Sequence, residues 1–287
     1  MDVRKDVLFN PRELFMKNMF FLITFFSYPV FAETLTDRIH SVVKSSPDSH
    51  IVRFEKGRVG FISSDLFEDL KDSSGTEVQV ELDQSSNIRS FDVVRDATSQ
   101  ESVVFLKNFE NPPVFEPTVI TSSQMNQIYK SMNQNFKRIS ECSDRAHVWA
   151  WDEFKKSGTK SQKAFIFFTA SYINRVRFKW WFHVAPMFDV GGQKMIADVM
   201  YKDRPITVKE WSDMMVFSKR DCKMTTKFSE YDVNPQTEDC YMMFDSMYYR
   251  LPGDLNGQEV RGTYRSDWNE SEVNGARSRA FNVGRIQ

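Results

Sequence analysis

Residues 180–198 read WWFHVAPMFDVGGQKMIAD, an apolar and aromatic run that a turn signal interrupts before it resumes. The part before the turn is rich in residues that favour β-strands, and residues 189–192, Asp-Val-Gly-Gly, are typical of a tight turn. Residues 193–198 then supply the return strand. The sequence therefore predicts a β-hairpin, and with it an antiparallel sheet in the C-terminal half of the chain.

A histidine lies in the middle of the first strand of this hairpin, among aromatic residues where a buried polar ring needs a partner. A turn centred between Val190 and Gly191 places His183 directly opposite Asp198, with Cβ atoms about 5 Å apart. If the turn is centred between Gly191 and Gly192, the two residues are diagonal neighbours on the same face of the sheet. If the pairing of the two strands shifts by a single residue, their side chains point to opposite faces. We expect the carboxylate to bind one ring nitrogen of His183; the alternative is that the two residues are unrelated in space.

Further upstream, residues 140–147 read SECSDRAH and mark the start of a helix that we expect over residues 142–156. Cys142 then lies at the helix N-terminus, where backbone N–H groups and the positive end of the helix dipole favour a thiolate. The same N–H groups could hold a developing oxyanion, and Arg145 adds a positive charge nearby. Cys142 is therefore the candidate nucleophile; the alternative is an inert buried cysteine.

A nucleophilic thiolate needs a base, and the chain contains four histidines. His40 and His50 lie in the N-terminal part of the chain. His147 follows the cysteine by five residues, which turns it about 140° around an ideal helix, so we expect a structural role for it. His183 is therefore the candidate base, with Asp198 as the residue that orients it.

The sequence around these residues resembles the bacterial protein-glutaminase family. The resemblance rests on CSDRAH at residues 142–147, on WFHVA at residues 181–185 and on an aspartate at the end of the next strand. It covers roughly residues 117–215. It implies a papain- and transglutaminase-like α+β fold, in which a helix carrying the cysteine packs on an antiparallel sheet carrying the histidine and the aspartate.

The resemblance also implies an activity. The family deamidates glutamine side chains of proteins to glutamate and releases ammonia, through a cysteinyl thioester and a triad that maps to Cys142, His183 and Asp198. Glutamine-bearing proteins or peptides are the expected substrates, and we expect no cofactor and no metal. One departure from the family pattern is Val199, which stands where a proline is expected.

Two alternatives remain at this point. The same triad would support a cysteine protease or a transglutaminase, which cleave or cross-link proteins. The chain would instead be a non-enzymatic exported binding module if Cys142 were inert. Nucleic acid is not an expected partner, because 38 Lys and Arg residues against 39 Asp and Glu residues give a net charge of only -1.

In the C-terminal half, apolar spacing predicts a helix over residues 122–138, ahead of the helix that starts at Cys142. Strands are expected over residues 164–170, 175–188 and 194–201. Helices come first and strands follow, which is an α+β pattern.

The chain divides into several expected segments. Residues 33–111 alternate short β-like runs with turn signals and predict a β-rich module. Three prolines predict a linker over residues 112–118, and the catalytic domain follows over residues 119–252. The polar residues 253–287 predict a surface-hugging or loosely ordered tail. We expect the module to be a pro-region that covers the site, as the resemblance also implies; a permanent substrate-recruiting or wall-binding module is the alternative.

Residues 1–32 have the features of a secretory signal peptide. Met16 and Lys17 precede an apolar stretch that ends in VFA at residues 30–32, and that stretch is too short to span a bilayer. Met16 is an alternative start, and a buried core helix is the alternative interpretation. The protein is expected to be secreted or periplasmic, without stable membrane insertion after cleavage.

An oxidising compartment would allow the cysteines to pair. Cys222 and Cys240 enclose a short polar loop, which a disulfide would stabilise, and Cys142 would remain free. The sequence leaves the oligomeric state and the physiological substrate open.

Overall fold

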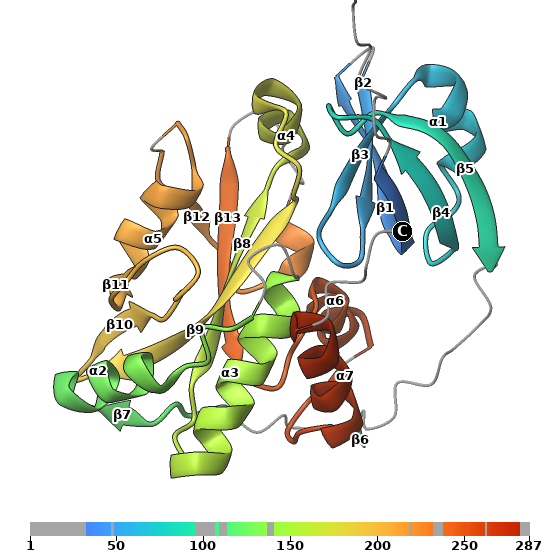
Figure 1. Ribbon diagram of the computed structural model, residues 1–287. Helices are drawn as coiled ribbons and strands as arrows, with labels where there is room; N and C mark the ends of the chain where they lie inside the picture. Colours follow the sequence, from blue (N-terminus) through green and yellow to red (C-terminus); the bar gives the residue numbers. More distant parts are fainter. Residues whose placement is uncertain are drawn as a thin grey trace, which may run out of the picture. The chain divides into compact units, whose positions relative to one another are not determined.

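The computed structural model (Figure 1) describes residues 33–46, 49–95, 107–108, 114–136, 141–218, 220–231, 238–261 and 263–281. The expected signal peptide and the prolines at 112 and 113 lie outside these ranges. Within the described ranges, no helix has the length and hydropathy that a membrane crossing requires.

The N-terminal part forms a five-stranded antiparallel sheet in the order β3-β2-β1-β4-β5. Alternate residues of β4 are buried, as period-2 patterning predicts, and one short helix accompanies the sheet. The elements are β1 (Glu33–Ser46), β2 (Ser49–Phe54), β3 (Val59–Ile62), α1 (Ser64–Leu70), β4 (Glu77–Leu82) and β5 (Ile88–Arg95).

The C-terminal part contains a seven-stranded sheet in the order β11-β10-β9-β8-β13-β12, and β7 pairs with β9 outside this path. Its long central pairs are antiparallel, whereas the short strands β7 and β12 pair in parallel. The strands are β7 (Val119–Ile120), β8 (Gln162–Phe168), β9 (Phe182–Val190), β10 (Gln193–Ile196), β11 (Ile206–Thr207), β12 (Lys223–Met224) and β13 (Cys240–Ser246). The expected α+β class is confirmed.

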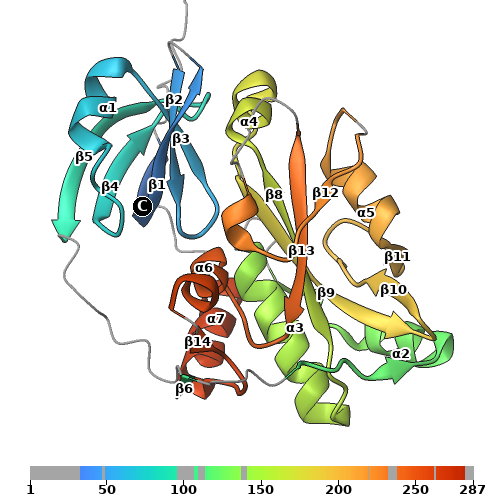
Figure 2. The ribbon, with the colours of Figure 1, turned by 180° about the vertical axis from the view of Figure 1, so that it is seen from behind.

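Helices surround this sheet, and α3 packs on β9 while α7 packs on α3 (Figures 1 and 2). The helix α3 ends at Gly158, whose φ of 74° is a left-handed conformation that favours glycine. The helices are α2 (Ser122–Ser131), α3 (Cys142–Ser157), α4 (Ala170–Val176), α5 (Val208–Met215), α6 (Pro252–Arg261) and α7 (Glu270–Phe281). A 3₁₀ turn spans Phe228–Glu230, and the short β6 (Lys107–Asn108) pairs with β14 (Thr263–Tyr264).

The expected strand over residues 175–188 is wrong in its first half. A helix, α4, precedes β9, because the side chain of Thr169 accepts a hydrogen bond from the backbone N–H of Tyr172 (3.2 Å) and caps the helix. Arg177 ends α4 in a left-handed conformation, with a φ of 53°. The strand therefore starts only at Phe182.

The C-terminal segment differs from the expected tail. Residues 252–261 and 270–281 form α6 and α7, and α7 contributes small apolar side chains to the buried core. Those side chains are Val273, Ala276 and Ala280. Apolar residues are sparse in this segment, so composition alone pointed to a polar tail.

The turn between β2 and β3 lies against the start of β9. Val59 N donates to Lys179 O (3.0 Å), and Trp181 N donates to Gly57 O (2.9 Å). The indole Nε1 of Trp181 donates to Phe54 O at 2.7 Å. Gly57 suits this turn because its φ is 105° and a Cβ atom would lie only 3.0 Å from an aromatic ring of β9.

Cys222 and Cys240 are bonded, as expected, and they close a loop with a sequence separation of 18 residues. We predict that the double substitution Cys222→Ser/Cys240→Ser lowers the free energy of unfolding by about 3 kcal/mol, because the open loop gains entropy in the unfolded chain. Denaturant unfolding with and without reductant measures the change. Reductant should have no effect on the double variant, and equal stability of the two proteins would contradict the prediction.

Candidate active site

The hairpin of β9 and β10 brings His183 and Asp198 together. Nε2 of His183 lies 2.7 Å from Oδ2 of Asp198, and both side chains are buried. Gln193 pairs with Val190, so the turn is centred between the two glycines, and the two candidate residues are not directly opposed. The later of the two expected turn positions is therefore the observed one.

The expected return strand over residues 194–201 ends early, because β10 stops at Ile196. Asp198 lies just beyond the strand, at the start of a turn in which its carbonyl accepts hydrogen bonds from Tyr201 N (3.0 Å) and Lys202 N (3.1 Å). The turn fixes the backbone of Asp198, so the position of its carboxylate does not depend on the strand register alone.

A second donor holds the same carboxylate. Nε1 of Trp211, on α5, donates to Oδ2 of Asp198 at 3.0 Å. The Trp211 side chain is fully buried, and its ring also lies 5.6 Å from the ring of His183, centroid to centroid. The sequence analysis missed Trp211, because its place on an apolar helix face is equally typical of a core residue.

Cys142 is the first residue of α3, with Glu141 at the N-cap position. Helix N-termini carry backbone N–H groups without intrahelical partners, and these favour an anion on the sulfur. The cysteine side chain is free and buried, it lines the same pocket as His183, and it helps to raise the pKa of that ring. His183 is therefore hydrogen-bonded to the carboxylate and shares its pocket with the thiol.

The protonation of His183 follows from these contacts. Burial opposes a charged ring, but Asp198 and then Cys142 outweigh this effect and raise the pKa of His183 to about 9. The imidazole is therefore protonated at neutral pH, which is the state that pairs with a thiolate.

The carboxyl group of Glu141, next to the cysteine, also has a raised pKa. Burial, followed by Asp37 and Asp144, raises the pKa of Glu141 to about 8. This acid is therefore mostly neutral at pH 7, so it does not place a full negative charge beside the sulfur.

A pocket of about 340 Å³ opens onto the cysteine and the histidine. Arg145, Trp180 and Tyr201 line it together with Cys142 and His183. Arg58, from the β2–β3 turn, also lines this pocket, so part of the N-terminal sheet borders the candidate site.

His147 lies elsewhere, as expected. Its Nδ1 is 2.7 Å from Nζ of Lys163, and both side chains are completely buried. Burial, followed by the charge of Lys163, holds the pKa of His147 well below its usual value. Of the other histidines, His40 stacks on Trp181 and His50 stacks on Phe67.

The donor set of the pocket does not resemble a metal centre. Among the residues that the structure describes, no group of three His, Cys, Asp or Glu side chains is arranged to hold a metal ion.

Comparisons with known proteins find one family model and similar solved structures. Residues 118–215 match the model of a family described as glutaminase. The matched region is about a third of the chain, and this part is similar to that family. It contains Cys142, His183 and Asp198, and it ends before α6 and α7.

Two solved structures are similar. A crystal structure of pro-protein-glutaminase aligns with a TM-score of 0.50 at 14% identity, over 88% of this chain and 94% of that chain, which supports a shared fold. An NMR structure of protein-glutaminase from Chryseobacterium proteolyticum aligns with a TM-score of 0.34 at 14% identity, over 55% of this chain and 84% of that one. No curated protein matches the chain in sequence.

The pKa of His183 predicts the alkaline side of the activity profile. Above about pH 9 the ring loses the proton that the leaving group needs, so kcat/KM of a reaction at this site should fall there. The apparent value belongs to the coupled cysteine–histidine pair. Asp198→Asn removes an anion that raises this pKa, so the fall should move to lower pH.

The matched control for this measurement is Asp213→Asn. Asp213 is a carboxylate on α5 that is 38% exposed and pairs with Lys209, so its loss should leave the profile unchanged. An Asp198→Asn profile that coincides with that of the unmodified protein would contradict the assignment.

Proposed function

We propose that the protein is an exported protein-glutamine glutaminase that converts glutamine side chains of proteins to glutamate through a cysteinyl thioester. The observation that carries this proposal is the buried His183–Asp198 hydrogen bond beside a pocket that Cys142 and His183 both line, within the region that matches the glutaminase family. Protein substrates accord with that family, and export is proposed from the sequence of residues 1–32.

The mechanism begins with the thiolate of Cys142, which attacks the carbon of the glutamine side-chain amide. The resulting oxyanion lies near the N-terminus of α3, where backbone N–H groups can stabilise it. The amide nitrogen then leaves as ammonia, with a proton from His183.

The neutral imidazole next takes a proton from a water molecule, which attacks the thioester and releases glutamate. Asp198 holds Nε2 of the ring throughout and leaves Nδ1 for these proton transfers. The carboxylate is thus an orienting group, and it takes no part in bond making.

The N-terminal sheet is proposed to be a pro-region that restricts the site. Arg58 lines the pocket, and the turn that carries it is hydrogen-bonded to residues 179 and 181 at the start of β9. The name pro-protein-glutaminase belongs to a structure with the same fold over most of both chains, which is consistent with this role. A permanent recruiting module is the alternative.

We predict that Cys142→Ala and His183→Ala each abolish ammonia release from a soluble protein substrate while the fold is retained, because the two side chains act as one unit. Asp198→Asn should lose less activity. Mass spectrometry of the treated substrate should show a gain of about one mass unit per site, with intact chains.

Several outcomes would contradict this assignment. Cleaved or cross-linked substrate would indicate a protease or a transglutaminase in place of a deamidase. A Cys142→Ala protein that keeps even about a tenth of the activity would exclude the nucleophile. An inactive His147→Ala protein beside an active His183→Ala protein would identify a different base.

Limited proteolysis tests the pro-region. Val114 is 85% exposed, so we predict that a protease cuts first between residues 111 and 118 and that activity rises as the cut proceeds. Adding back the separately produced module should inhibit the trimmed enzyme. Trimmed Cys142→Ala protein is the control for contaminating activity. Full activity before trimming, with no increase afterwards, would favour a permanent module.

A further inference from the structure

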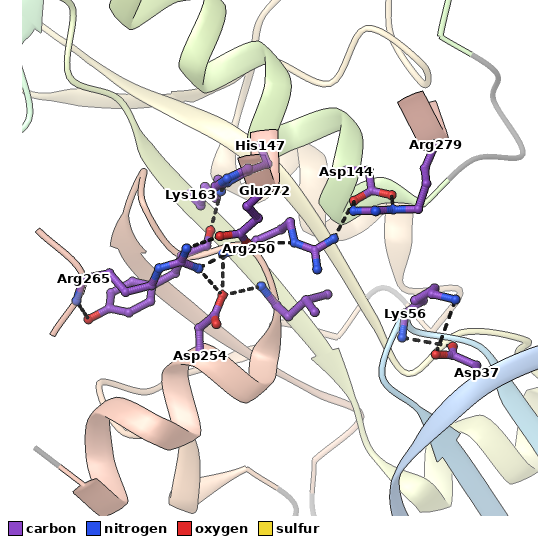
Figure 3. Close-up of polar contacts among 12 residues, drawn as sticks. Asp37, Lys56, Asp144, His147, Lys163, Arg250, Asp254, Arg265, Glu272 and Arg279 are labelled. Atoms are coloured by element: carbon purple, nitrogen blue, oxygen red, sulfur yellow. Dashed lines mark hydrogen bonds and ion pairs between the residues drawn. The ribbon is translucent and has the colours of Figure 1, made fainter. Parts of the chain in front are cut away.

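A buried carboxylate lies two residues after the nucleophile. Asp144 is in the first turn of α3 and is 1% exposed. It accepts hydrogen bonds from Arg250 Nη1 (2.7 Å) and from Arg279 Nε (2.8 Å) and Nη2 (2.9 Å) (Figure 3). Both arginines lie outside residues 118–215, the part of the chain that matches the glutaminase family.

The arginine nearest the core is itself held in place. Nε of Arg250 donates to Glu272 Oε1 at 2.9 Å, and Arg265 binds both Glu272 and Asp254 (Figure 3). Oδ2 of Asp254 also accepts hydrogen bonds from the backbone N–H groups of Arg250 and Leu251. Asp254 of α6 thus holds the backbone of Arg250, and Glu272 of α7 holds the guanidinium that binds Asp144.

The geometry of an α-helix relates the two arginine contacts of Asp144 to the position of the thiol. Residues two apart in an α-helix point about 200° apart around its axis, so Asp144 and Cys142 lie on roughly opposite sides of the first turn. A rotation of this turn about the helix axis would move Asp144 away from its arginines and the sulfur away from His183 at the same time. Holding the carboxylate therefore holds the sulfur.

We propose that Asp144 is a positioning residue for the reaction: Arg250 and Arg279 fix it, and the fixed first turn of α3 holds the Cys142 sulfur against His183. This inference rests on the proposed function and deepens it, because it makes the C-terminal helices part of the working enzyme. The two guanidiniums also compensate a carboxylate that would otherwise oppose a thiolate nearby.

The decisive comparison is between two arginines of α7. Arg279→Ala removes a contact to Asp144 in the first turn of α3, whereas Arg277→Ala removes a contact from the same helix to Asp152, further along α3 (Nη1 to Oδ2, 3.0 Å). Each substitution removes one arginine–carboxylate pair between α7 and α3. A loss of general helix packing would therefore affect both variants.

For Arg279→Ala we expect kcat to fall about 10- to 100-fold with little change in KM, as a small displacement of a reacting group produces. Alkylation of Cys142 by iodoacetamide should also slow at pH 7, and its pH profile should move to higher pH. The other charged groups facing the pocket or adjoining the thiol, Arg58, Glu141, Arg145 and His183, are common to both variants. Arg277→Ala should match the unmodified protein in all three measurements.

A conservative variant separates charge from geometry. Arg279→Lys keeps the positive charge but loses the two-pronged contact, so it should restore the alkylation profile more fully than kcat. Equal losses in the Arg277→Ala and Arg279→Ala proteins, or no loss in either, would overturn the proposal. Alkylation needs no substrate, so this comparison still decides the role of Asp144 if the protein releases no ammonia from glutamine.

Discussion

One carboxylate oxygen organises the candidate site. Oδ2 of Asp198 accepts hydrogen bonds from His183 Nε2 and from Trp211 Nε1, and so it joins β9 to α5 through the turn that follows β10. An imidazole that is bound on one nitrogen can turn toward the sulfur with the other nitrogen only. The orientation of the base is therefore set by a residue outside the sheet that carries it, and the indole limits where that carboxylate can lie.

Two buried histidines show how strongly neighbouring groups affect the pKa of an imidazole. Burial disfavours the charged ring of both His147 and His183. His183 faces the carboxylate of Asp198 and the sulfur of Cys142, and its pKa rises to about 9. His147 faces the amino group of Lys163, and burial, followed by this neighbour, lowers its pKa. Both rings are buried, so their neighbouring groups decide the opposite directions of the two pKa shifts.

The sequence could predict the parts of the fold that depend on local signals. The start of the helix at Cys142, the α+β class and the disulfide depend on caps, apolar periodicity and cysteine spacing, and the structure agrees with all three. The hairpin turn had two possible positions, because Gly191 and Gly192 can both adopt positive φ, and the observed turn uses both. The helices α6 and α7 could not be predicted from apolar periodicity. They have few apolar residues, and α7 is also joined to Asp144 and Asp152 of α3 through Arg279 and Arg277, pairs between distant residues that leave no local pattern.

The contact between the N-terminal sheet and β9 constrains any role for the module. Ile51, Val59 and Phe61 share one buried cluster with the strands of the catalytic sheet, and the fully buried indole of Trp181 is hydrogen-bonded to Phe54. A cut in the linker removes none of these contacts. It removes only the tether, which keeps the module at an effective concentration on the order of millimolar. A cleaved module would therefore be held by these contacts alone and would dissociate more readily than the tethered one, so cleavage and release are separate steps with separate rates.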